Sequence, residues 1–71
     1  MATPTKHSVI VAGHRTSVSL EAPFWQQFGA IAGARGVTVN RLVTEIDRDR
    51  DGSLSSAIRL FVLEHVAGNA R

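Results

Sequence analysis

Cysteine is absent from the 71 residues. Its absence excludes disulfide bonds and thiolate metal sites, and it removes any argument for a secreted, disulfide-stabilised scaffold. Long apolar runs are absent too, because the longest candidates, SVIVAG and LFVL, are far shorter than the ~20 residues that span a bilayer. Residues 1–7 carry one lysine and no apolar segment, so we expect no signal peptide and no membrane partner.

Catalytic and metal-binding motifs are also missing. His7, His14 and His65 do not have the spacing of metal ligands. Residues 47–54, DRDRDGSL, match the start of an EF-hand calcium loop, but Ile58 replaces the bidentate glutamate and two arginines lie within the segment. We interpret this segment as a solvated charged turn with local ion pairs. We therefore expect no enzyme, no cofactor, no metal site and no small-molecule substrate.

The length of the chain predicts one small domain. A domain of this size buries only about 60% of the surface of its unfolded chain, so a solitary core is marginal. Small domains compensate with disulfides, a metal or a partner subunit. With the first two excluded, oligomerisation is favoured.

Basic side chains are concentrated in the N-terminal part of the chain. Residues 1–41 have a net charge of +3 and residues 42–71 a net charge of −1, which together give the +2 of the whole chain. A basic half can favour a polyanionic partner.

Two strand patterns come first along the chain. Residues 8–11 are short, apolar and β-branched, which favours a strand. Residues 12–14 interrupt it, with Gly13 available for a positive φ or a bulge. In residues 15–20 the side chains alternate, so that Val18 and Leu20 share a buried face while Arg15, Ser17 and Ser19 share a polar one.

Three helical patterns follow. Pro23 in a first turn favours a helix start and Gly36 its end, while Thr38 and Ser53 are candidate N-caps of two further helices. The apolar face of the third helix is wider than one side, and a second subunit would bury it. We expect a disordered tail at 1–7, the domain at 8–67 and a frayed end at 68–71. The predicted apolar positions are Phe24, Phe28, Ile31, Ala32; Val39, Leu42, Val43, Ile46; and Leu54, Ile58, Leu60, Phe61, Val62, Leu63, His65, Val66.

The order strand, helix, helix resembles the ribbon-helix-helix family of Arc- and MetJ-type repressors. The residues that carry the resemblance are Ser17-Val18-Ser19-Leu20, Phe24 to Ala32, and the turn Gly36-Val37-Thr38-Val39-Asn40-Arg41-Leu42. More narrowly, GHRTSVSLE, FW and LSSAIR are similar to a group of short bacterial proteins of this family. The resemblance covers Ser8 to His65. It implies a mostly helical α+β fold with an extra N-terminal strand and an extra C-terminal helix, forming an intertwined homodimer. Because the sequence predicts no membrane span and no signal peptide, we expect the protein in a bacterial cytoplasm.

The resemblance also implies sites on double-stranded DNA. Two protomers would pair their strands into an antiparallel ribbon that enters the major groove. The outward residues of this ribbon would touch bases, with an arginine able to bond guanine O6 and N7 together. The start of the second helix would bind phosphate through its backbone N–H groups and dipole. The matching residues are Arg15, Ser17 and Ser19 for bases, and Thr38, Val39, Asn40 and Arg41 for phosphate.

Each of these sites has a plainer alternative. The polar strand face also fits an ordinary solvated surface, and Thr38 and Asn40 also fit a helix cap. The leading functional hypothesis is a transcriptional regulator, such as a repressor, that binds an operator as a dimer or higher oligomer. The alternatives are an antitoxin that represses its own operon, and a protein-interaction module that has lost DNA binding.

Overall fold

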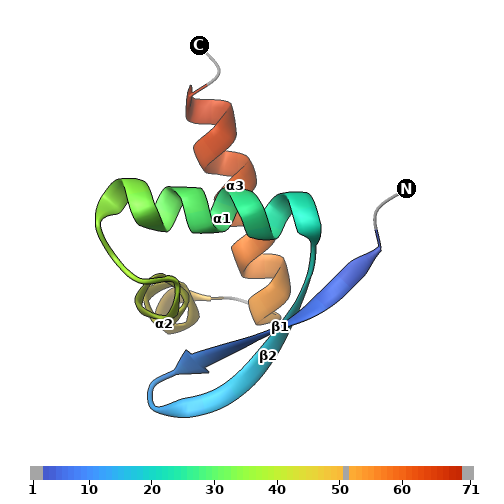
Figure 1. The fold of residues 1–71 in the computed structure, drawn as a ribbon, viewed down its shortest axis with the longest axis vertical. Helices are drawn as coiled ribbons and strands as arrows, with labels where there is room; N and C mark the ends of the chain where they lie inside the picture. Colours follow the sequence, from blue (N-terminus) through green and yellow to red (C-terminus); the bar gives the residue numbers. More distant parts are fainter. Residues whose placement is uncertain (1–2, 51, 70–71) are drawn as a thin grey trace.

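The computed structural model describes residues 3–50 and 52–69. Within them, two strands precede three helices: β1 (Pro4–Val11), β2 (His14–Glu21), α1 (Ala22–Arg35), α2 (Val39–Asp49) and α3 (Leu54–Asn69). Figure 1 shows α1 lying above the twisted strands, with α3 crossing behind α1 and α2 beside the strands. The expected mostly helical α+β fold is confirmed.

The two strands form an antiparallel hairpin. Each residue of β1 is paired with a residue of β2, from Pro4 opposite Glu21 to Val11 opposite His14. The connecting turn consists of Ala12 and Gly13, whose φ angles are 52° and 82°. Positive φ at both central residues is the geometry of the type I′ turn, whose twist matches that of the flanking strands. Gly13 therefore serves a hairpin turn and not a bulge.

The first strand begins earlier than expected. It starts at Pro4, so residues 4–7 lie in β1 although we expected them in a disordered tail. These polar residues are held in the strand by contacts with residues far away in the sequence. The Thr5 hydroxyl donates to the carbonyl oxygen of Leu20 at 3.2 Å, and the His7 ring stacks on Trp25 with 4.1 Å between centroids. At the other end, α3 includes residues 68 and 69 of the expected frayed end; residues 1–2 and 70–71 lie outside the described residues.

The hairpin removes one argument for a dimer. The resemblance implies that two protomers pair their strands into the ribbon. In the structure β2 is paired along its whole length with β1 of the same chain, so a two-stranded ribbon forms without a partner strand. The homodimer itself stays a prediction.

Local signals set the helix ends as expected. The Thr38 hydroxyl accepts from the N–H of Arg41 at 3.1 Å, and the Ser53 hydroxyl accepts from the N–H of Ser56 at 3.1 Å. These bonds satisfy backbone donors that the first turn of a helix leaves without a partner. Gly36 ends α1 in the left-handed conformation, with a φ of 72°.

One hydrophobic core lies between the hairpin and the helices. α2 packs on β1, α3 packs on β2, and α1 contacts both other helices. Phe28 is fully buried and meets Phe61 edge-on, with 6.1 Å between ring centroids. Phe24, Trp25 and Phe61 are half-buried and pack against this core. The buried set is Val9, Val11, Val18, Leu20, Phe28, Ile31, Ala32, Leu42, Val43, Ile58 and Val62.

The charged segment 47–52 is only partly a turn. α2 continues through Asp49, and Arg50 Nε pairs with Asp47 Oδ1 at 2.6 Å. This ion pair is of the local kind that we expected; Asp51 lies outside the described residues. Over residues 3–50 and 52–69, no group of three or more His, Asp or Glu side chains could hold a metal ion. None of the helices in the same residues is long and apolar enough to cross a bilayer.

Candidate nucleic-acid interface

The outward face of β2 carries the three residues predicted to touch bases. Arg15, Ser17 and Ser19 are exposed, while Val18 and Leu20 between and beside them are buried. This alternation follows from the pleat, which points successive side chains to opposite faces. The strand therefore presents one cationic and two hydroxyl side chains on a single accessible face.

The first strand extends this face, which the sequence reading did not foresee. Lys6 lies opposite Ser19, Ser8 opposite Ser17, and Ile10 opposite Arg15. All three residues of β1 are exposed, so the outward face is two strands wide. A signal for this was present in the sequence. Two strand-like runs separated by two residues that end in glycine are typical of a hairpin.

The start of α2 carries the residues predicted to touch phosphate. Val39 is half-buried against the core, whereas Thr38, Asn40 and Arg41 are exposed. The Thr38 hydroxyl caps the helix, as described above. The Arg41 guanidinium lies 3.5 Å from the carboxylate of Glu45, four residues along the helix. A single exposed pair at this spacing contributes only about 0.3–0.5 kcal/mol, so Arg41 is only weakly held in place.

A hydrogen bond brings the start of α2 to the hairpin. The Oδ1 atom of Asn40 accepts from the backbone N–H of Ile10 at 3.0 Å. Asn40 and Arg15 consequently line one open hollow of about 320 Å³, together with Ser8, Val9 and Ile10. The structure thus places a predicted base-contacting residue beside a predicted phosphate-contacting residue.

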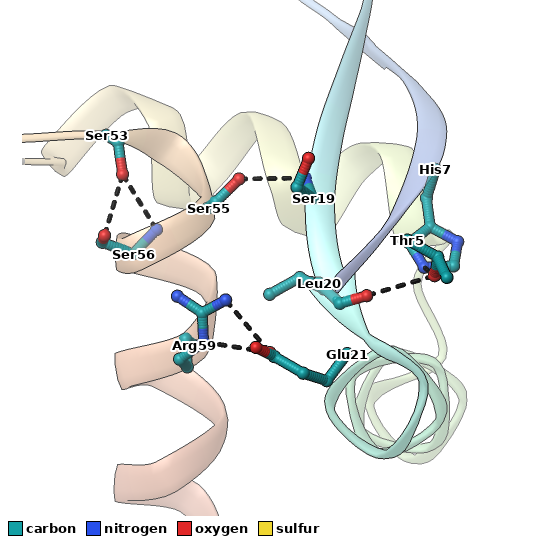
Figure 2. A network of polar contacts seen from close by, with 9 residues as sticks. All are labelled: Thr5, His7, Ser19, Leu20, Glu21, Ser53, Ser55, Ser56 and Arg59. Carbon is teal, nitrogen blue, oxygen red and sulfur yellow. Dashed lines mark hydrogen bonds and ion pairs between the residues drawn. The ribbon is translucent and has the colours of Figure 1, made fainter. Parts of the chain in front are cut away.

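Ser19 lies toward the other end of the face, where α3 meets β2. The N–H of Ser19 donates to the hydroxyl of Ser55 at 3.0 Å (Figure 2). Nearby, Arg59 binds Oε1 of Glu21 through Nε at 3.2 Å and through a terminal nitrogen at 3.0 Å. The guanidinium also lies 5.6 Å from the centre of the Phe24 ring. These contacts, which the sequence reading missed, tie α3 to the hairpin.

The ion pair with Arg59 also sets the charge of Glu21. A backbone hydrogen bond at Glu21, followed by the hydrogen bond from Arg59, holds the pKa of this carboxyl below its usual value of 4.5. Glu21 is therefore ionised at neutral pH and faces a cation of its own chain. Its negative charge is compensated locally, so it does little to oppose the positive charge of the outward face.

Comparison with known proteins agrees with this architecture. The profile of the family described as "Ribbon-helix-helix domain" matches residues 4–66, from the start of β1 into the last turns of α3. No curated protein and no solved structure matches the chain significantly.

Proposed function

The chain belongs to the ribbon-helix-helix family, and from that premise we propose that it is a transcriptional regulator that binds operator DNA as a homodimer, alone or in larger assemblies. Domains of this family are DNA-binding regulatory domains and not enzymes. The observation that carries the proposal is the exposed face of the hairpin. A two-stranded ribbon fits the width of the major groove, where base edges carry a full donor and acceptor code.

Within this proposal, Arg15 is the principal reader of sequence. Its planar guanidinium can bond O6 and N7 of a guanine together, which is the commonest specific contact to DNA. Ser17 and Ser19 have short hydroxyl side chains that donate or accept, and they discriminate weakly between bases. One ribbon therefore supplies limited specificity, and tandem sites would be needed for strong selection.

The start of α2 is proposed to bind a phosphate group. The backbone N–H groups of Val39 and Asn40 lie at the positive end of the helix dipole, which favours an anion. The Thr38 hydroxyl and the Asn40 side chain add polar groups, and Arg41 adds a positive charge. Such contacts hold the protein in register on the duplex without reading its sequence.

The test is DNA binding by wild type and by Arg15→Ala, measured by gel shift on random-sequence duplexes and then on the duplexes that selection enriches. Losing a bidentate guanine contact should cost about 1–3 kcal/mol, which is about 5- to 150-fold in affinity. Arg48→Ala is the matched control. Arg48 is an exposed arginine about two helical turns beyond Asn40, so its loss should change affinity little.

Two outcomes would contradict the proposal. One is an absence of binding by wild type even at about 50 mM salt, where phosphate contacts are strongest. The other is equal affinity of wild type and Arg15→Ala for the selected duplex.

The proposed homodimer is supported by the surface of α3. Leu60, Leu63 and Val66 are 57%, 52% and 44% exposed, which is unusual for large apolar side chains gathered on one helix. Burying them against a second copy would remove this area from water. Sedimentation of wild type and Leu63→Glu should give a dimer and a monomer; two monomers, or two dimers, would contradict a dimer that forms through α3.

Both alternatives from the sequence stay open, with different support. Antitoxins of this kind often bind their toxin through an open C-terminal segment, whereas here the C-terminal segment is the helix α3, which lends the antitoxin hypothesis no support. The interaction-module hypothesis fits the exposed apolar side chains of α3. A dimer that enriches no sequence from random DNA would favour that hypothesis. A cytoplasmic location is a further part of the proposal.

A further inference from the structure

We propose that β1 supplies half of the outward face of the hairpin that contacts DNA. In this proposal Lys6 contacts a DNA phosphate and Ile10 contacts the methyl group of a thymine. The inference rests on the proposed function but goes beyond it, because the expected contacts all lay on β2 and α2. It also changes the origin of the ribbon. Both strands that face DNA come from one chain, so each subunit carries a complete reading element.

The hydrogen bonds at the hairpin edges show how closely the two strands share this face. The N–H of Ile10 points out of the hairpin to Asn40, and the N–H of Ser19 points out to Ser55. Because the two kinds of pair alternate along the ladder, Ile10–Arg15, Ser8–Ser17 and Lys6–Ser19 are all non-hydrogen-bonded pairs. In such pairs the opposed Cα atoms are only about 4.5 Å apart, and the side chains are closest.

The six residues form three rows across the ribbon. At one end Lys6 lies opposite the hydroxyl of Ser19, and in the middle Ser8 and Ser17 place two hydroxyls opposite each other. At the other end the apolar Ile10 lies opposite the cationic Arg15. The end rows are four residues apart, which is about 14 Å along an antiparallel strand. This spacing matches about four base-pair steps of 3.4 Å. The rows are Lys6–Ser19, Ser8–Ser17 and Ile10–Arg15.

Lys6 has the properties of a phosphate contact. It is exposed, and its ammonium is a compact charge on a flexible stem, which binds phosphate without demanding one geometry. The one acidic residue of the hairpin, residues 4–21, is Glu21, which is paired with Arg59. The positive charge of Lys6 is therefore available to a polyanion.

Ile10 has the properties of a base contact despite being apolar. Its side chain is 45% exposed beside Arg15, although every other large apolar residue of the hairpin is buried. Apolar side chains in the major groove recognise the C5-methyl group of thymine. The hydrogen bond that Asn40 Oδ1 accepts from the N–H of Ile10 holds the Ile10 backbone and so helps to position this side chain on the outward face. The row Ile10–Arg15 would thus favour a thymine close to a guanine.

The first experiment measures the salt dependence of binding for Lys6→Ala, with Arg48→Ala as the control. Each phosphate contact contributes about 0.9 to the slope of log affinity against log salt. Losing one contact per chain should reduce the loss of affinity between about 50 and 200 mM salt by about 3.5-fold per bound chain. Thermal unfolding checks that both variants are folded.

The second experiment replaces each thymine of the selected duplex with deoxyuridine, which lacks the methyl group. Wild type should bind more weakly at one such position, whereas Ile10→Ser should bind the thymine and uracil duplexes equally. The same salt slope for Lys6→Ala and Arg48→Ala, or no thymine position that depends on Ile10, would overturn the inference. If Arg15→Ala still lost affinity in that case, the proposed function would stand. If wild type bound no DNA, the proposed function itself would fail.

Discussion

Replacing Asn40 separates a structural role of this side chain from a role in DNA binding. Its Oδ1 atom accepts from the N–H of Ile10, and its amide nitrogen is the donor that would reach a phosphate. Asn40→Ala removes both groups. Asn40→Asp keeps the acceptor and removes the donor, so the pair of variants tests the two roles independently.

The expected change in global stability on replacing Asn40 with alanine is small, so the hydrogen bond is better tested by a measurement at Ile10 itself. A typical hydrogen bond contributes about 0.5–1.5 kcal/mol, and this one is exposed, so water can replace the lost acceptor. Alanine is also a better helix former than asparagine by up to about 0.7 kcal/mol. The two effects nearly cancel in global stability. Exchange of the Ile10 amide hydrogen reports the bond directly, and in Asn40→Ala it should speed up by between about twofold and tenfold.

Amide exchange by NMR and DNA binding by gel shift form the assay. In Asn40→Asp the Ile10 amide should stay protected, because a charged acceptor makes a stronger bond and suits the first turn of a helix. Its DNA affinity should nevertheless fall, because a carboxylate repels phosphate. Equal Ile10 exchange in wild type and Asn40→Ala would refute the structural role. Unchanged DNA affinity in Asn40→Asp would refute the phosphate role.

Three further predictions concern stability. Phe28→Ala, at a fully buried site, should cost about 3–5 kcal/mol in urea unfolding, and a loss below about 1 kcal/mol would contradict the packing described. The lowered pKa of Glu21 means that its stabilising effect is present above its ordinary value of 4.5 and is lost as pH falls through the folded value. The Tm of wild type should therefore drop more steeply below about pH 4.5 than that of Glu21→Gln; parallel curves would argue against this pair. Ala12→Asn should raise stability by about 0.5–1 kcal/mol, because asparagine tolerates the positive φ of 52° better than alanine; a lower urea midpoint would count against the type I′ turn.

The helices show how far local patterns reach. The caps at Thr38 and Ser53 and the helix end at Gly36 lie where the sequence predicted them. Each depends on contacts within a few residues, and the apolar spacing of each helix depends on its own periodicity. Caps and apolar spacing can therefore be predicted from one segment of the sequence without knowing which other segments pack against it.

The hairpin contains features that local sequence patterns do not predict. Residues 4–7 look like a polar tail, and only the bond of Thr5 to Leu20 and the stacking of His7 on Trp25 hold them in a strand. Asn40 likewise reads as a cap or a phosphate contact, and its bond to the distant Ile10 is invisible in sequence. In each case the partner is many residues away, and no periodicity points to it.

The sequence alone determined the helix caps at Thr38 and Ser53, the end of α1 at Gly36, and which face of residues 15–20 is polar, because these follow from side-chain spacing and local backbone chemistry. The family followed from the resemblance of its motifs to known proteins, which the family profile confirms. Only the tertiary structure decided that β2 pairs with β1 of its own chain, and that Lys6, Ser8 and Ile10 share the polar face. The physical reason is register. Alternation shows which side chains share a face of one strand, but turn geometry and long-range contacts determine which strand lies beside it.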